Sequence, residues 1–205
     1  LRVLIVAEFF VLLLGLLIAI ARTTTSPVLY PLRLVATIYT DLFRGLPLLL
    51  VLLLVGLGIP GLRISWIPNS AVVLGTVALV LTYSAYVAEV IRAGIEGVNP
   101  TQRQAARALG LSQSQTLEHV VLPQAFRNVT PPLLNDLVSL QKDSGHISVL
   151  GAVDAIRAAG IQTAQSFNFT PYLVAGALFV LLTIPLTRFT DWLTRRQDAR
   201  QRAQG

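Results

Sequence analysis

Polar and ionisable side chains recur in one otherwise apolar stretch of this chain, PPLLNDLVSLQKDSGHISVLGAV at residues 131–153. Four of them have the i, i+4, i+7, i+11 spacing of one helical stripe: Asn135, Ser139, Lys142 and His146. Asp136 and Asp143 lie beside that stripe, while leucine and valine occupy the other faces. Such a stripe could line a path that solvates a zwitterion, or it could join helices through polar contacts. The sequence leaves both interpretations open.

A second stretch, QAARALGLSQSQTLEHVVLP, carries the signals of two short helices joined at a glycine. Asn99 is a good N-cap, and Pro100 follows at the first helical position. We expect the first helix to stop at Gly110, which suits a left-handed C-cap. Ser112, with a glutamine three residues later, forms a capping box for the next helix. Pro123 is expected to prevent the simple continuation of that helix.

This helical pair has three possible roles. A DNA-reading helix-turn-helix is disfavoured, because its second helix, QSQTLEHVV, has no arginine or lysine and one glutamate, whereas nucleic acid binding needs a basic surface. A capped connector on the membrane surface is the plain alternative. The third role, which we favour, is a docking module for a cytoplasmic partner.

Several kinds of chemistry are missing from the chain. Lys142 is the only lysine, and it lies outside any G-x-x-x-x-G-K-[ST] loop, so the chain cannot bind ATP through that motif. The absence of cysteine and the presence of two histidines leave no basis for a thiolate or histidine metal cluster. His119 is isolated, and no Ser/His/Asp arrangement is evident. We therefore expect no catalytic residue, metal or cofactor in this chain.

The composition indicates a membrane protein. Of the 205 residues, 54% are apolar and 13% are charged, about half the roughly 25% of a soluble domain. A soluble protein of this size could not bury so much apolar surface. The chain begins at Leu1 inside an apolar run, so we expect that it was cut near the start of a first membrane helix.

About 20 apolar residues are needed to cross a bilayer. Three segments meet this length directly: Val3–Ala21, Ala71–Ile91 and Tyr172–Phe189. A fourth, Leu46–Ile59, reaches it only if its helix begins upstream, near residues 34–39. The polar stretch 131–153 is the fifth candidate. Hydropathy does not select it, but the arginine distribution requires it.

With five spans and an external N-terminus, most arginines fall in cytoplasmic segments, as the positive-inside rule expects. The inner set is Arg22, Arg33, Arg92, Arg103, Arg107, Arg127, Arg188, Arg195, Arg196, Arg200 and Arg202. The outer set is Arg2, Arg63 and Arg157. Without the fifth span, either the arginine-rich tail or the Arg92–Arg127 loop would face outward. The helical pair is then a cytoplasmic loop.

Other ionisable residues lie in or near the expected spans. Glu89 and Arg92 lie at the cytoplasmic end of one span, and we interpret them mainly as an interfacial pair that orients the helix. Arg44, close to Pro47, is expected at a kinked helix entrance. Glu8 needs a partner if the first span includes it.

The helical pair resembles the EAA loop of ATP-binding-cassette importer permeases, whose pattern is E-A-A, three residues, G, nine residues and I-x-L-P. The matching residues are Gln104, Ala105, Ala106, Gly110, Val120, Leu122 and Pro123. The family's usual glutamate is Gln104 here, an amide that can form hydrogen bonds but carries no charge. Further resemblance to the polar amino-acid branch of histidine and glutamine type permeases lies in YTDLFRGLPLLL, SAYVAEVIRAGI and LQKDS.

The resemblance implies an all-α polytopic membrane protein of about five transmembrane helices with a cytoplasmic coupling-helix loop. It implies a transmembrane permease domain over residues 1–193, with its coupling loop at about 99–123, and a basic cytoplasmic tail over 194–205. The function implied is the permease subunit of an ATP-driven importer for polar amino acids, in a bacterial inner or plasma membrane. The N-terminus is expected outside and the C-terminus in the cytoplasm.

The implied partners are cytoplasmic ATPase subunits that hold ATP and Mg, a second permease subunit in a homo- or heterodimer, an extracytoplasmic solute-binding protein and the lipid bilayer, with no nucleic acid. The implied ATPase-coupling residues are Gln104, Ala105, Ala106, Gly110, Leu122 and Pro123. For the substrate pathway, the polar stretch offers Asn135, Asp136, Ser139, Lys142 and Asp143.

Two alternatives come from other classes of membrane protein. A secondary transporter or channel would also explain the spans and the polar stripe, but it typically shows internal repeats or broken helices, which the sequence does not reveal. A structural membrane subunit without transport activity is compatible with the same spans. ATPase-dependent uptake would separate both alternatives from an importer permease.

Overall fold

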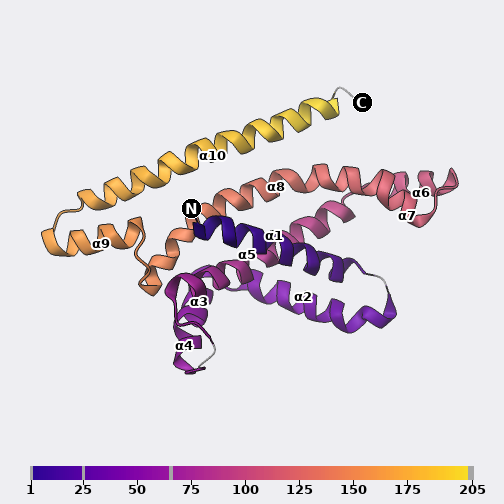
Figure 1. Ribbon diagram of the computed structural model, residues 1–205. Helices are drawn as coiled ribbons and strands as arrows, with labels where there is room; N and C mark the ends of the chain where they lie inside the picture. Colours follow the sequence, from indigo (N-terminus) through magenta and orange to yellow (C-terminus); the bar gives the residue numbers. More distant parts are fainter. Residues whose placement is uncertain (1, 25, 65–66, 203–205) are drawn as a thin grey trace.

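The computed structural model describes residues 2–24, 26–64 and 67–202, and this part of the chain is helical without any β-strand (Figure 1). The α-helices are α1 (Arg2–Thr23), α2 (Tyr30–Gly45), α3 (Leu48–Leu53), α4 (Ile59–Gly61), α5 (Ala71–Glu96), α6 (Pro100–Ala108), α7 (Gln113–Thr116), α8 (Leu122–Asp143), α9 (Ala155–Ser166) and α10 (Thr170–Arg202). Short 3₁₀ turns, η1 (Pro27–Leu29) and η4 (Ser144–Leu150), and π turns, η2 (Leu54–Gly58) and η3 (Leu117–Val121), connect them.

Three helices of the described residues are long and apolar enough to cross a membrane: Arg2–Thr23, Ala71–Glu96 and Thr170–Gln197. They coincide with the three segments that hydropathy selects from the sequence. A bent pair, Pro27–Gly45 and Leu48–Gly61, passes the same test when its two parts are taken together. The all-α polytopic architecture expected from the sequence is therefore confirmed.

The fourth expected span is a broken helix. Its two parts meet at an angle of 106°, which agrees with the kinked helix entrance expected near Pro47 but is a sharper break than one helix that begins near residues 34–39 would have. Leu46 and Pro47 are both extended, with ψ of 136° and 133°. Pro47 lacks an N–H and disfavours helical backbone in the residue before it, which explains the break.

Helix α5 lies at the centre of the bundle, and more than half of its most apolar part is buried. Helix α1 packs along α5 at Gly15, where a Cβ atom would lie 2.5 Å from Cγ1 of Val87. Helix α2 is tied to α5 by the Tyr39 hydroxyl, which donates to the Leu81 carbonyl at 2.7 Å. The close approach at Gly15 and this hydrogen bond hold α1 and α2 against one central helix.

The second helix of the helical pair does not end at Pro123. It passes through the π turn η3 into α8, which continues for 22 residues and also contains Pro131 and Pro132. Pro123 falls in the first turn of α8, where a missing N–H is tolerated. Where the sequence predicts the end of a helix, the chain instead changes helical register and continues. Helix α8 therefore begins at Leu122, nine residues before the polar stretch 131–153.

The α-helical part of that stretch ends at Asp143 and continues as the 3₁₀ turn η4. The expected stripe therefore does not extend to His146, whose ring contacts the Asp143 carbonyl at 3.1 Å. In Figure 1, α8 runs through the middle of the molecule and joins the α6–α7 end to the α9 end.

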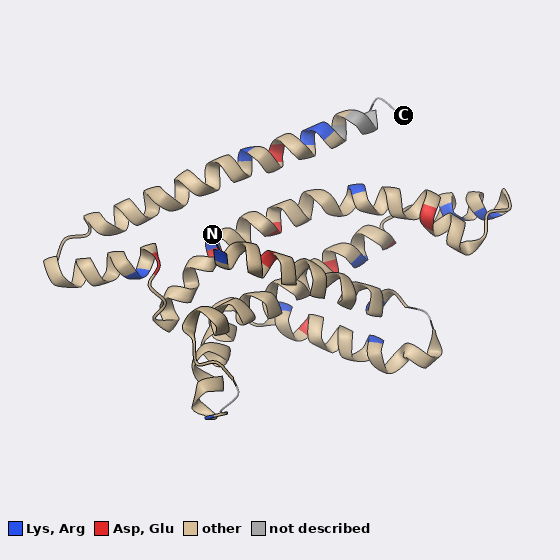
Figure 2. Cartoon of the chain, in the orientation of Figure 1, with Lys and Arg blue, Asp and Glu red and all other residues tan. Residues whose placement is uncertain are grey.

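Helix α10 continues to Arg202 and so includes most of the tail expected over 194–205, whose last three residues lie outside the described part of the chain. Figure 2 shows that the charges of α10 lie in its second half. The uncharged first half leaves leucine and valine side chains exposed, as a lipid-facing or subunit-facing helix requires.

Candidate functional site

The helical pair has the caps that the sequence predicts. The Asn99 side chain accepts a hydrogen bond from the Thr101 amide at 2.9 Å, which starts α6. Gly110 has φ of 88°, so the turn between the helices uses left-handed backbone. Ser112 and Gln115 then form a reciprocal capping box at the start of α7. These local contacts fix the shape of the pair.

The coupling residues implied by the resemblance differ in exposure. Ala106 is buried against the neighbouring helix turns, whereas Ala105 and Gln104 are exposed. Gly110 at the tip, Leu122 and Pro123 are exposed as well. Ala106 therefore packs the pair together, and the exposed residues are available to a partner.

A polar cavity of about 310 Å³ lies where the start of α3 meets α5 and α8. Three residues of the predicted pathway line it from α8: Asp136, Ser139 and Asp143. The opposite wall comes from Leu48 of α3 and from Thr82, Tyr83 and Tyr86 of α5. The break between α2 and α3 places Leu48 at this wall.

The polar atoms of this cavity are only partly satisfied. The Tyr83 hydroxyl donates to Oδ2 of Asp143 at 2.7 Å. Oδ2 of Asp136 and Oγ1 of Thr82 are buried without a hydrogen-bond partner among the described residues. An unpaired buried carboxylate oxygen and hydroxyl are costly unless they bind something else. The cavity can therefore donate to and accept from a polar molecule.

Two residues proposed for the pathway do not line this cavity. Asn135 and Lys142 are exposed on another face of α8. Sequence reasoning missed Thr82, Tyr83 and Tyr86, although the run LTYSAY places three hydroxyl groups and a further serine in an apolar span, which is the signal that could have found them. Glu8 of α1 lies within electrostatic range of Asp136 and has no hydrogen bond or ion pair within the described ranges.

A cluster of charges joins the ends of three helices. Glu89 of α5 accepts from Arg22 of α1 at 2.7 Å and from Arg92 at 2.6 Å. Arg44, at the end of α2, lies 3.7 Å from the same carboxylate and is more exposed. Arg92 also pairs with Glu96. The expected pair of Glu89 and Arg92 is confirmed, and its contact with Arg22 makes it a link between helices.

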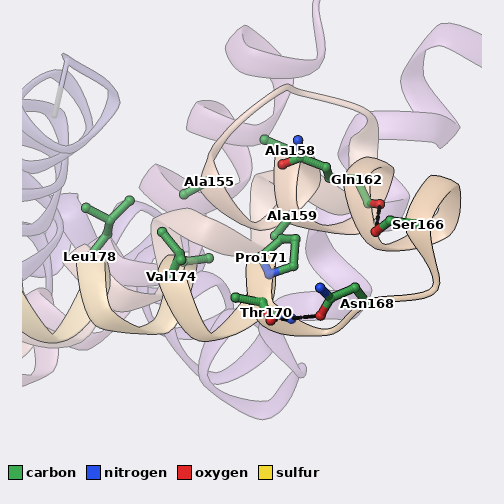
Figure 3. A pocket seen from close by; sticks show the side chains of 11 residues that line it. Ala155, Ala158, Ala159, Gln162, Ser166, Asn168, Thr170, Pro171, Val174 and Leu178 are labelled. Atoms are coloured by element: carbon green, nitrogen blue, oxygen red, sulfur yellow. Dashed lines mark hydrogen bonds between the residues drawn. The ribbon is translucent and has the colours of Figure 1, made fainter.

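A larger cavity, of about 560 Å³, lies between α9 and the start of α10 (Figure 3). Its lining residues are uncharged and include several alanines. The polar groups visible there bond to each other, as Ser166 does to the Gln162 carbonyl and Thr170 to Asn168. This cavity has no charged group that could orient a substrate, and none of the predicted site residues lines it.

Two relatives are similar in sequence to most of the chain. It is 35% identical over 188 residues to the arginine transport system permease protein ArtQ of Bacillus subtilis, covering 91% of this chain and 84% of the relative. It is 39% identical over 181 residues to a putative glutamine transport system permease protein of Rickettsia conorii, covering 88% and 81%.

Two solved structures have a similar fold. A crystal structure of an amino acid ABC transporter with histidines superposes with a TM-score of 0.86 at 35% identity, covering 95% of this chain and 89% of that one. An inward-facing structure of the MetNI methionine ABC transporter shares the fold, with a TM-score of 0.76 at 18% identity and coverage of 96% and 91%.

The family described as binding-protein-dependent transport system inner membrane component matches residues 11–201, which include all of α5 to α9 and nearly all of α10. This match contains both the helical pair and the polar cavity. The chain therefore belongs to the family of inner membrane components of binding-protein-dependent transport systems.

Proposed function

We propose that this chain is the transmembrane permease subunit of an ATP-driven importer for polar amino acids, and that it couples its pathway to a separate ATPase. The observation that carries the proposal is the partly unsatisfied polar cavity inside an apolar helix bundle whose relatives are named as amino-acid permeases. The residues of such a cavity would otherwise impose a cost on the membrane protein without benefit.

The proposed pathway passes through the cavity of Asp136, Ser139 and Asp143. Its lining contains two carboxylates and no lysine or arginine. Carboxylates stabilise ammonium and guanidinium groups through charge-assisted hydrogen bonds. The cavity is therefore suited to the α-ammonium of an amino acid, and a cationic side chain would gain most. Hydroxyl groups of Thr82 and Tyr86 supply donors for the neutral polar atoms of the cargo.

The proposed coupling surface is the exposed part of the helical pair: Gln104, Ala105, Gly110, Leu122 and Pro123, with Ala106 packing beneath them. ATP hydrolysis and Mg binding are assigned to the partner ATPase. A second permease subunit and an extracytoplasmic solute-binding protein complete the proposed assembly, in line with a family of binding-protein-dependent systems.

We propose that α8 with η4 also crosses the membrane, as the fourth of five spans in chain order, and that the N-terminus lies outside. The permease domain would cover residues 1–193, followed by the basic cytoplasmic tail. The Arg22–Glu89–Arg92 contacts support this arrangement, because they place the ends of α1 and α5 at one side of the bundle. In chain order α1 is the first span and α5 is the third, so both must cross the membrane in the same direction. The contact between their C-terminal parts agrees with this requirement.

Paired leucine substitutions on α8 test the pathway. Ser139→Leu fills the cavity wall and should block uptake of radiolabelled arginine, histidine or glutamine into cells that express the complete transporter. Asn135→Leu changes the same helix outside the cavity and should leave uptake near the wild-type rate. Equal uptake by both variants, at equal membrane levels, would remove the cavity from the pathway.

A further inference from the structure

A second cavity, of about 330 Å³, lies within the helical pair itself. Its walls come from Arg103 and Arg107 of α6, Gln113 and Thr116 of α7, and Leu117 and Val121 of η3. No aspartate or glutamate is among these lining residues. The walls are therefore mostly apolar, and the two arginines are their only charged residues. The cavity belongs to the part of the chain that we assign to the ATPase-facing loop.

Two polar atoms at this cavity have no partner among the described residues. They are Oγ1 of Thr116 and Nε of Arg103, and both atoms are buried. Thr116 as a whole is only 5% exposed. A buried hydroxyl or guanidinium N–H without a partner is a specific cost, and such groups usually bind a ligand, a water or another chain.

The two arginines of this cavity are anchored but not neutralised. Arg103 donates to the Ile95 carbonyl near the end of α5, and Nη1 of Arg107 donates to the Leu111 carbonyl at 2.7 Å. Neither guanidinium forms a salt bridge within the described ranges. Their orientation is thus held by backbone oxygens while their charge is available to an acceptor.

We propose that this cavity receives an acidic side chain of the ATPase, whose carboxylate accepts hydrogen bonds from Thr116 and from Arg103 or Arg107. Carboxylates fit the guanidinium fork and can accept further donors at the same time. Charge complementarity selects this occupant, since α6 has no acidic residue and the only charged residues that line the cavity are Arg103 and Arg107. This inference rests on the proposed function of the helical pair.

Thr116→Val gives a test in which stability and binding change in different directions. Valine keeps the shape but removes the unpaired hydroxyl, so the isolated permease in detergent should melt at the same or a higher temperature. Its affinity for the ATPase that copurifies with the affinity-tagged chain should fall roughly tenfold, because a hydrogen bond to a charged group is lost. Unchanged affinity would overturn the proposal.

Two arginine variants form a matched pair for the charge. Arg107→Gln removes a charge from the cavity, whereas Arg127→Gln removes the same charge from an exposed position on α8 outside it. In permease reconstituted in lipid nanodiscs, Arg107→Gln should weaken ATPase binding and flatten its dependence on salt. Arg127→Gln should leave both close to wild type, and equal effects of the two variants would contradict an occupant inside the cavity.

The outcome separates this inference from the function on which it rests. If no ATPase copurifies with the wild-type chain, the proposed function fails. If the ATPase binds and Thr116→Val has no effect on affinity, only the cavity assignment fails. Free acetate or glutamate could also be titrated onto the isolated permease. If either anion raises the melting temperature of the wild-type permease but not of Thr116→Val, and neither changes the affinity for the ATPase, the cavity holds a small anion and the proposal is overturned.

Discussion

Substitution of Gly110 isolates one physical quantity, the conformation of a single backbone turn. Its φ of 88° lies in the left-handed region, and a Cβ atom at this position would meet no other atom within 4 Å. The cost of a side chain is therefore backbone strain and not steric overlap. That strain is about 1–2 kcal/mol for an ordinary L-residue, is lower for asparagine and is greatest for β-branched residues.

A variant with a side chain at position 110 relaxes its turn when it is free. The ATPase must then restore the observed left-handed turn on binding, and the strain energy is lost from the binding free energy. Since about 1.4 kcal/mol corresponds to a factor of ten, Gly110→Val should weaken ATPase binding by roughly 5–30-fold. Gly110→Asn should weaken it by much less, because asparagine adopts left-handed backbone more readily. Titration of ATPase onto permease in nanodiscs measures both values, with membrane insertion and melting temperature as controls. Equal affinity of the two variants would refute the assignment of this turn.

Further predictions follow from the site and the charge cluster. Glu89→Gln removes the carboxylate from the largely buried Arg22 and should destabilise the permease by about 1.5–3 kcal/mol, seen as a lower melting temperature in detergent; an unchanged melting temperature would mean that the link carries no stability. Asp136→Asn should reduce uptake of arginine more than uptake of glutamine, because the cavity loses a negative charge; a parallel decrease of both would speak against charge selection there. Gln113→Cys, the only cysteine of that variant, should react with a membrane-impermeant maleimide in opened membranes but not in intact cells, and labelling in intact cells would reverse the proposed orientation.

Features that depend on local contacts could be predicted from the sequence. The caps at Asn99 and Ser112, and the positive φ at Gly110, each depend on side chains or backbone within a few residues. Three spans were also evident, because the bilayer requires a long apolar helix whatever its neighbours are. Neither kind of feature depends on which other helices pack against it.

The sequence could not predict which face of α8 is enclosed by other helices. The expected stripe passes through Asn135, Ser139 and Lys142, with Asp136 and Asp143 beside it, whereas the cavity is lined by Asp136, Ser139 and Asp143. The helical period is the same, but the face is displaced by part of a turn. Periodicity gives the spacing of polar residues, and only packing against α3 and α5 decides which side is enclosed.

A kink near Pro47 was expected from the sequence, whereas the continuation of the helix through Pro123 was not. Proline at position 47 produces a sharp bend, yet proline at position 123 lies in a helix that continues through η3. A π turn changes the backbone hydrogen-bonding pattern, so a proline after it need not end the helix. Whether the chain stops or continues depends on the contacts available to the freed carbonyl groups, which include residues distant in sequence.

The most direct test of the account is transport by the reconstituted system. The affinity-tagged chain, its copurifying ATPase and the solute-binding protein encoded with it would be placed in proteoliposomes with radiolabelled amino acid. Uptake should require ATP on the ATPase side and the binding protein on the other side, and it should persist when an ionophore collapses the ion gradients. Uptake that continues without ATP and stops with the ionophore would contradict the account and identify a secondary transporter.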